Sequence, residues 1–253
     1  DGPEHWRVER VSFAAAYGGE RVLAWLFLPR NAKPPYQTVV YFPPSSATQL
    51  SSSEGLGSWE FGFLVRSGRA VLFPVYKGTY ERRVPPARGP NEVRELVIQR
   101  TKDVRRAVDY LESRPDVDSS RLAFYGLSMG ANYGPVVGAV ETRFRTLVLV
   151  SGGLAGGRPP EVSNLNFAPR VRMPVLMENG RHDFSSPLEE SQRPLFRLLG
   201  TPEGSKRHVL FDSGHVPPFT EVARETIDWL DRFLGPVAPG TPSNRSCSCR
   251  RPR

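Results

Sequence analysis

Cysteine is scarce in this sequence, which has two among its 253 residues, Cys247 and Cys249, both within the last seven positions. A disulfide framework therefore does not hold the fold together. The Cys247-x-Cys249 spacing is also too close for a zinc knuckle, and no companion ligands accompany it. We expect no metal site, and we assign this pair to a C-terminal tail.

Long apolar runs are missing as well. No stretch approaches the ~18 uninterrupted apolar residues that a membrane-spanning helix needs, so we expect no membrane span. The chain opens at Asp1 without a basic and then apolar leader, so we expect a soluble protein whose compartment stays open, and the chain can equally be a fragment of a longer one. A phosphate-binding G-x-x-x-x-G-K motif is also absent, and no cofactor is implied.

Acidic residues are outnumbered, since 34 basic and 26 acidic residues give a formal net charge of +8. Half of this excess comes from the tail at 237–253, which has Arg245, Arg250, Arg251 and Arg253 and no acid. Elsewhere acids are interleaved with bases, and no zinc-finger or RNA-binding signature accompanies them. We therefore expect no nucleic-acid partner.

Short apolar runs alternate with amphipathic segments along most of the chain. The apolar runs predict buried strands at 37–42, 69–76, 121–126, 144–151, 173–180 and 206–214. Helical periodicity between them predicts helices at about 55–67, 91–114, 129–140, 187–199 and 217–234. Parallel neighbours need a crossover connection, so this alternation predicts an α/β fold with a mostly parallel central sheet flanked by helices.

Local signals add detail to this layout. Residues 7–29 predict an antiparallel N-terminal hairpin with Gly18-Gly19 as its turn. Asn91 is the predicted cap of the long helix. The basic, proline-rich residues 77–90 predict an exposed loop. We expect one domain over residues 1–236, followed by a basic, disordered tail at 237–253.

The segment Gly126-Leu127-Ser128-Met129-Gly130 is a G-x-S-x-G motif between a predicted strand and a predicted helix. A turn this sharp strains its central residue, and the flanking glycines let neighbouring backbone come close. Ser128 would then project its hydroxyl from the carboxyl edge of the sheet. A plain helix-capping serine is the alternative interpretation.

A serine hydroxyl needs a base to act as a nucleophile, and the base needs an orienting acid. Asp183 follows the predicted strand at 173–180, and His215 follows the last predicted strand. The chain order Ser, Asp, His, with each residue after a separate strand, is the order expected of an α/β-hydrolase. Asp212 is the rival acid, and its position at a strand end makes it the weaker candidate.

These residues resemble those of the serine α/β-hydrolases of the dienelactone hydrolase and prolyl-oligopeptidase-like type. The resemblance covers roughly residues 8–235, through the GLSMG, GRHD and DSGH segments. It implies that Ser128 attacks an acyl carbonyl, that His215 shuttles the proton and that Asp183 orients the imidazole. This chain has serine where a dienelactone hydrolase has cysteine.

An oxyanion hole needs two donors placed near the developing charge. The backbone N–H of Met129, directly after the nucleophile, is the first predicted donor. The second normally comes from the loop after the strand at 37–42, where this chain has two prolines, which lack an N–H. The remaining donors are the backbone of Ser45 or Ser46, or the phenol of Tyr41, since the oligopeptidase-like branch uses a tyrosine in this loop. We favour Ser45.

Relatives often have a helical lid between the strands at 144–151 and 173–180. Here about twenty residues rich in Gly, Pro and Asn fill that gap, so we expect little or no lid. The site would then be open and bounded by the loops at 77–90 and 152–172. The predicted substrate-lining side chains are Trp59, Tyr76, Phe167 and His182.

A serine carboxylesterase acting on a small-molecule ester is the predicted function. A peptidase or acylaminoacyl hydrolase of the same fold is one alternative. A catalytically silent binding module is another, although such a module has no need of all three residues. The sequence leaves the acyl and alcohol groups of the substrate and the oligomeric state open.

Overall fold

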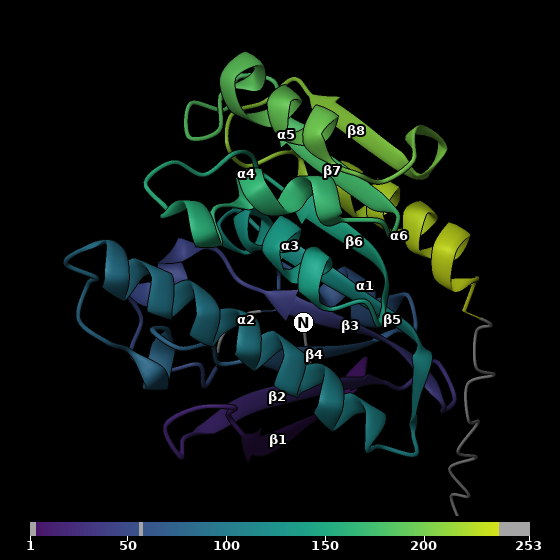
Figure 1. Cartoon of the computed structure of the whole chain (residues 1–253). Helices are drawn as coiled ribbons and strands as arrows, with labels where there is room; N and C mark the ends of the chain where they lie inside the picture. The colour runs from purple at the N-terminus through teal and green to yellow at the C-terminus, as the bar shows by residue number, and fades with distance from the viewer. Residues whose placement is uncertain (1–3, 56–57, 238–253) are drawn as a thin grey trace, which may run out of the picture.

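The computed structural model describes residues 4–55 and 58–237. Its centre is an eight-stranded sheet with the strand order β1-β2-β4-β3-β5-β6-β7-β8 (Figure 1). The strands are β1 (Trp6–Ala14), β2 (Arg21–Pro29), β3 (Tyr36–Phe42), β4 (Ala70–Pro74), β5 (Val117–Leu127), β6 (Phe144–Val150), β7 (Val175–Gly180) and β8 (Lys206–Phe211). The tail predicted to be disordered lies outside the described residues, apart from Val237.

The sheet is antiparallel at its N-terminal edge and parallel elsewhere. Strand β1 pairs with β2 in an antiparallel hairpin, and β2 pairs antiparallel with β4. All later pairs, from β3–β4 to β7–β8, are parallel. The hairpin turn contains Gly18 and Gly19 with φ of +59° and +64°, a left-handed conformation that favours glycine. The predicted hairpin and mostly parallel sheet are confirmed.

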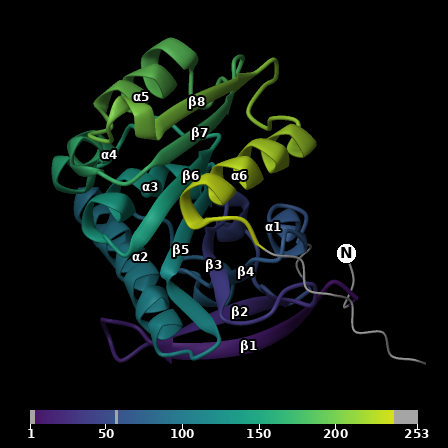
Figure 2. The same cartoon turned by 90° about the vertical axis from the view of Figure 1, so that its right-hand side faces the viewer.

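Helices cover both faces of the sheet (Figure 2). One layer contains α2 (Pro90–Glu112), α3 (Met129–Val140), α4 (Asn164–Phe167) and α5 (Arg193–Leu198), and the other contains α1 (Gly62–Arg66) and α6 (Phe219–Leu234). Alternate residues of a strand point to opposite faces. Accordingly, Val40 and Phe42 of β3 join the core under α2 and α3, whereas Val39 and Tyr41 join the core under α1 and α6.

Several predicted helix boundaries are wrong. Helix α2 begins at Pro90 after Gly89, which makes no side-chain cap bond, so Asn91 is not the cap. Proline at the first helical position has its φ preset and lacks only an N–H that would stay unpaired anyway. The helix predicted at 187–199 is divided into a π-helical turn (Leu188–Gln192) and α5, because Pro194 lacks the N–H that would join them.

The prediction of an exposed loop over 77–90 holds only for its later residues. Thr79 and Tyr80 are buried. Arg82 anchors the loop by donating to Asp103 Oδ2 of α2 at 2.6 Å and to the Tyr17 hydroxyl at 2.6 Å. Buried or half-buried charges are paired in this way because an unpaired one is costly. The start of the loop is therefore fixed between α2 and the hairpin.

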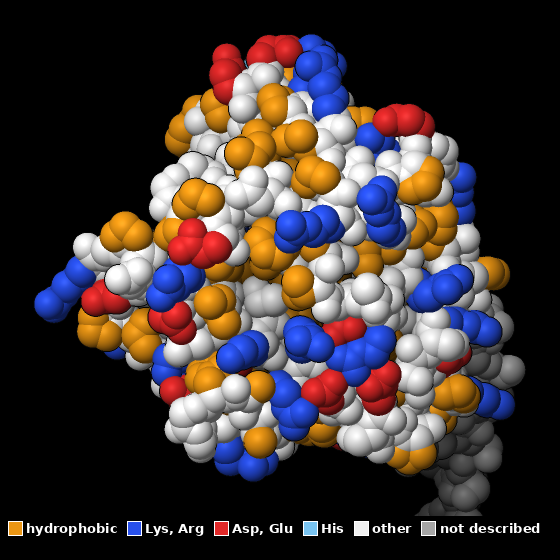
Figure 3. All heavy atoms as spheres, viewed as in Figure 1, with side chains coloured by type: hydrophobic (Ala, Val, Ile, Leu, Met, Phe, Trp, Pro, Cys, Tyr) orange, Lys and Arg blue, Asp and Glu red, His pale blue; other side chains and the backbone are white. Residues whose placement is uncertain are grey.

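Basic and acidic side chains lie next to each other on the face that carries α2 and α3 (Figure 3). On this face Arg143 forms ion pairs with Asp109, Glu112 and Glu141. A stripe of one sign, the usual electrostatic footprint of a nucleic-acid site, is therefore not seen on the face drawn. Among the described residues, no helix is both long and apolar enough to cross a membrane.

Strand β7 contains a fully buried acid, Glu178. Its Oε2 accepts a hydrogen bond from Thr226 Oγ1 at 2.7 Å, and its Oε1 has no hydrogen-bond partner among the described residues. Burial disfavours the charged form and raises the pKa of Glu178 to about 8. The folded chain therefore keeps a proton that an unfolded chain loses at a pH near 4.5.

This buried acid predicts a pH-dependent effect of Glu178→Gln. Between pH of about 4.5 and 8 the folded state binds the extra proton, so the wild-type free energy of unfolding falls by about 1.4 kcal/mol per pH unit from this group. The neutral amide removes that loss, and the variant gains stability over the wild type from pH 5 to pH 8. Urea unfolding at pH 5 and at pH 8 measures the difference in the free energy of unfolding between the variant and the wild type. Glu190→Gln, at an exposed position, is the control. An equal difference at pH 5 and pH 8 would contradict the assignment.

Candidate active site

Ser128 lies at the sharp turn between β5 and α3, as the motif predicts. Its φ is +52° and its ψ is −103°, a strained conformation for a residue other than glycine. The backbone on both sides holds it there, because Ser128 N–H donates to Val150 O at 2.8 Å and Asn132 N–H donates to Ser128 O at 3.0 Å. The serine thus sits at the carboxyl edge of the sheet, where the parallel strands end.

Close backbone packing explains the two glycines of the motif. A Cβ atom on Gly126 would lie 2.5 Å from the carbonyl carbon of Gly130. A Cβ atom on Gly130 would lie 2.2 Å from the carbonyl oxygen of Phe42, at the end of β3. Both distances are far below contact, so any side chain at either position would separate α3 from the sheet.

The structure brings Ser128, His215 and Asp183 together from the ends of β5, β8 and β7. Ser128 Oγ lies 2.8 Å from His215 Nε2, and His215 Nδ1 lies 2.8 Å from Asp183 Oδ2. Asp183 is buried, and its Oδ1 accepts the backbone N–H groups of Ser185 at 2.8 Å and Ser186 at 3.1 Å. These bonds fix the carboxylate and leave its other oxygen for the imidazole.

Backbone contacts hold the His215 loop in place. A Cβ atom on Gly180 would lie 1.8 Å from the carbonyl oxygen of Gly214, so the ends of β7 and of the His215 loop touch directly. Ser151 Oγ donates to the carbonyl oxygen of His215 at 2.6 Å. Sequence analysis does not single out Ser151, although a serine that ends a strand and precedes Gly152 and Gly153 is a usable signal of a turn at the sheet edge.

His182 and Asp212 pair with each other at the surface. Their side chains are 66% and 91% exposed, and His182 Nε2 lies 2.9 Å from Asp212 Oδ1. The rival acid is therefore bonded to a different histidine from the one beside Ser128. His182 does not line the cavity at Ser128. This lining prediction is wrong because the His182 side chain turns outward to water after β7 ends.

A cavity of about 260 Å³ opens at Ser128. Its lining comes from the loops after β3, β5, β6 and β8 and from the segment before α1: Pro44, Ser45, Ser46, Trp59, Glu60, Leu127, Ser128, Val150, Ser151, His215, Val216, Pro217 and Phe219. Ser45, Ser46 and Trp59 are the predicted site residues in this set besides Ser128 and His215. Neither the 77–90 loop nor the 152–172 segment contributes to it.

Two predicted lining residues belong to the core. Tyr76 is fully buried, its ring stacks on Phe42 with 3.8 Å between centroids, and its hydroxyl donates to the Tyr41 carbonyl at 2.9 Å. Phe167, at the end of α4, packs against the core under α2 and α3, on the other side of the sheet from the cavity. Both predictions are wrong. Tyr76 turns into the core just after β4 ends, and Phe167 lies on a short helix that packs against the same core.

Of the candidate oxyanion donors, Met129 and Ser45 lie beside Ser128 or its cavity, whereas Tyr41 is buried away from it. Met129 begins α3 directly after Ser128, and Ser45 begins a short 3₁₀ turn (Ser45–Thr48) at the rim of the cavity. Tyr41 is fully buried, and its phenol donates to Glu60 Oε2. Its hydroxyl is therefore committed to a carboxylate, and Tyr41 does not line the cavity.

Glu60 is a lining residue that sequence analysis misses. Burial raises the pKa of this carboxyl, and the hydrogen bond from Tyr41 opposes that effect. The pKa of Tyr41 is raised in turn by its own burial and by the neighbouring Glu60 charge. An acid set between the apolar residues of the 55–67 segment is the sequence signal that could have drawn notice to it.

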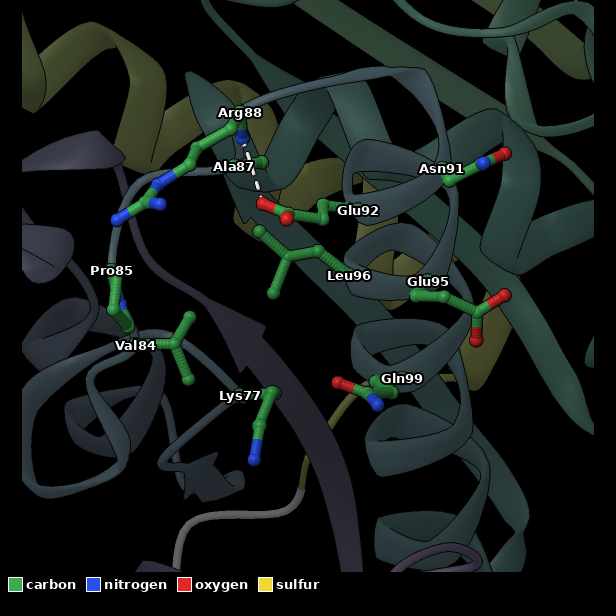
Figure 4. A pocket seen from close by; sticks show the side chains of 10 residues that line it. All are labelled: Lys77, Val84, Pro85, Ala87, Arg88, Asn91, Glu92, Glu95, Leu96 and Gln99. Atoms are coloured by element: carbon green, nitrogen blue, oxygen red, sulfur yellow. Dashed lines mark hydrogen bonds between the residues drawn. The ribbon is translucent and has the colours of Figure 1, made fainter.

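A second cavity of about 440 Å³ lies between the 77–90 loop and the first turns of α2 (Figure 4). Val84, Pro85 and Leu96 form apolar walls, and the Arg88 N–H donates to Glu92 Oε2 at 2.8 Å at its rim. The 77–90 loop therefore bounds this cavity rather than the one at Ser128. Within the part of the chain that the structure describes, no group of three or more His, Cys, Asp or Glu residues could hold a metal ion.

The known proteins reported below resemble this chain at low sequence identity. No protein-family model matches the chain. The uncharacterized protein YfhR of Escherichia coli (strain K12) is 24% identical over an alignment of 259 residues, gaps included, that covers 93% of this chain and 84% of that protein.

Solved structures match more fully in shape than in sequence. A cold-adapted esterase from an Arctic intertidal metagenomic library has a TM-score of 0.72 at 22% identity, over 91% of this chain and 95% of its own. The acetyl xylan esterase of Paenibacillus sp. R4 has a TM-score of 0.70 at 19% identity, over 91% of this chain and 85% of its own. A "putative dipeptidyl aminopeptidase IV" of Bacteroides ovatus has a TM-score of 0.72 at 17% identity, over 92% of this chain and 37% of that longer one. The sheet order, the strand-to-helix turn at Ser128 and these likenesses show that the chain has the α/β-hydrolase fold.

Proposed function

We propose that the protein is a serine hydrolase that cleaves carboxylic esters through an acyl-enzyme on Ser128. The observation that carries this proposal is the unbroken line of 2.8 Å contacts from Ser128 Oγ to His215 and from His215 to the buried Asp183. This line ends in a cavity that a small acyl or alcohol group can enter. A binding module would not need this proton path.

The reaction proceeds in two halves. His215 Nε2 takes the proton of Ser128 Oγ as that oxygen bonds to the ester carbonyl carbon. The resulting oxyanion accepts hydrogen bonds from the backbone N–H groups of Met129 and Ser45. The carbon–alkoxy bond then breaks, and the alcohol leaves with the proton from His215.

Water completes the cycle. His215 accepts a proton from a water molecule, whose oxygen attacks the acyl carbon, and the carboxylic acid leaves as Ser128 Oγ takes the proton back. Asp183 keeps the proton of the neutral imidazole on Nδ1, so that Nε2 faces Ser128 as an acceptor, and it stabilises the imidazolium that forms. The two backbone N–H bonds to Asp183 Oδ1 hold the carboxylate for this task.

A peptidase of the same fold is the second candidate. It is favoured by the TM-score of 0.72 to the Bacteroides ovatus protein, although that likeness spans 37% of the longer chain. Hydrolysis of p-nitrophenyl butyrate compared with alanyl p-nitroanilide distinguishes the two. A higher kcat/KM on the ester supports the esterase, and a higher value on the anilide supports the peptidase.

Ser128→Ala is expected to lower kcat on p-nitrophenyl butyrate by at least about 10³-fold, because the attacking oxygen is lost. The variant is also expected to lose labelling by a fluorophosphonate. Ser205→Ala, in the turn before β8, is the matched control and should keep the wild-type rate. A Ser128→Ala protein with wild-type turnover would refute the proposed nucleophile.

Asp183→Asn and Asp212→Asn test which acid serves the base. In Asp183→Asn the new amide favours the wrong imidazole tautomer, and kcat is expected to fall by about 10⁴-fold. The Asp212 side chain is 91% exposed and bonded to His182, so Asp212→Asn should change kcat less than twofold. Steady-state kinetics on the same ester measure both, and the reverse ranking would assign the acid to Asp212.

Gly180→Ala tests the contact between the loops. The added Cβ would meet the Gly214 carbonyl oxygen at 1.8 Å, so the loop that carries His215 must shift. A displacement near 1 Å costs roughly 10²-fold in kcat. Gly204→Ala, whose Cβ would meet nothing within 4 Å, is the control. Normal kcat in a folded Gly180→Ala protein, checked by circular dichroism, would show that the contact does not position His215.

A further inference from the structure

Resting on the proposed esterase, we propose that Glu60, Trp59 and Phe219 form a cation-binding subsite beside Ser128. The substrate class would then be esters whose acyl or alcohol part bears a positive charge, such as a quaternary ammonium group. Glu60 lines the same cavity as Ser128 and His215.

The carboxylate of Glu60 has a hydrogen-bond donor but no positive partner. Its Oε2 accepts from the buried phenol of Tyr41. Throughout residues 4–55 and 58–237, no basic side chain forms an ion pair with it. A half-buried carboxylate that stays unpaired is costly, so the cavity is electrostatically incomplete without a cation.

Aromatic rings form the wall next to this carboxylate. Trp59 is 56% exposed although it lines the cavity, and its ring centroid lies 5.3 Å from that of Phe219. The ring of Phe63 backs Phe219 at 5.8 Å. Cations bind over the faces of such rings, most strongly over tryptophan. In the described structure, arginine and lysine side chains lie over other rings but none lies over Trp59.

The rest of the lining contains nothing that would repel a cation. Its remaining members are serine, proline, valine, leucine and His215, with no lysine or arginine. Burial raises the pKa of Glu60, whereas a bound cation would favour the ionised form and offset that effect. A carboxylate, the exposed ring of Trp59 beside the half-buried ring of Phe219, and the absence of lysine or arginine are together the chemistry that recognises an ammonium group.

Matched pairs of esters test this proposal on both sides of the scissile bond. On the acyl side, the p-nitrophenyl ester of 4-(trimethylammonio)butanoic acid is compared with that of its neutral carbon analogue, 5,5-dimethylhexanoic acid. On the alcohol side, choline butyrate is compared with 3,3-dimethylbutyl butyrate. In at least one pair, the wild type is expected to prefer the cation by about tenfold or more in kcat/KM.

The variants separate charge from structure. Glu60→Gln keeps an oxygen that accepts from Tyr41 but loses the charge, so the ratio of cationic to neutral kcat/KM should fall severalfold, to the smaller preference that the rings alone provide. Trp59→Leu should lower that ratio severalfold because the π face is lost. Glu221→Gln removes the same charge two residues after Phe219, at an exposed position outside the lining, and should leave the ratio unchanged.

A binding measurement gives a readout that does not depend on turnover. Phenyltrimethylammonium is expected to slow fluorophosphonate labelling of the wild type, whereas neutral tert-butylbenzene should slow it much less. Glu60→Gln should reduce this difference severalfold. If Glu60→Gln does not fold, judged by circular dichroism, the wild-type comparison and Trp59→Leu still decide the matter.

The outcomes distinguish this inference from the function on which it rests. Neutral esters hydrolysed with a ratio near one in both pairs would overturn the cation subsite and leave the esterase standing. A cation preference that is undiminished in Glu60→Gln would overturn the assignment to Glu60. A protein that hydrolyses no ester and takes no phosphonate label would overturn both proposals.

Discussion

Direct backbone contact at the carboxyl edge of the sheet is the constraint on which the site depends. The end of β3, the end of β5 and the start of α3 meet with no side chain between them, because Gly126 and Gly130 leave that space free. This packing holds Ser128 at φ +52°, a conformation that costs on the order of 1–3 kcal/mol by itself. The orientation of the serine hydroxyl is therefore set by the fold as a whole, and its short contact with His215 follows from it.

Charge is distributed unequally on the two sides of Ser128. The lining of the cavity toward α1 and α6 includes Glu60 but no lysine or arginine. On the other side, Arg100 donates to the Tyr133 hydroxyl at 3.1 Å, and the guanidinium of Arg158 lies over the Tyr133 ring at 4.3 Å. Burial lowers the pKa of Arg158, and the charge of Arg100 lowers it further. Ser128 thus lies between a cavity with one acid, Glu60, and a group of basic and aromatic side chains.

Periodicity predicts the strands and most of the helices, because these depend on local pattern. Ser128, Asp183 and His215 could be singled out because each follows the end of a predicted strand, in the order Ser, Asp, His. The lining of the cavity depends on which face of the sheet a side chain occupies after its strand has ended, and loop sequence carries little of that information. Tyr76 therefore turns into the core, whereas Glu60, an ordinary acid in sequence terms, faces the cavity. Helix starts also differ where proline presets the backbone, as at Pro90.

The touching loops at Gly180 and Gly214 have a mechanical consequence. Their backbones are in van der Waals contact, and His182 N–H donates to Ser213 O at 2.9 Å. The segments that carry the acid and the imidazole are therefore held together at this point. Any movement that widens the cavity on the His215 side must carry the Asp183 segment along with it. The imidazole and its carboxylate can then shift relative to Ser128 as a unit, without parting from each other.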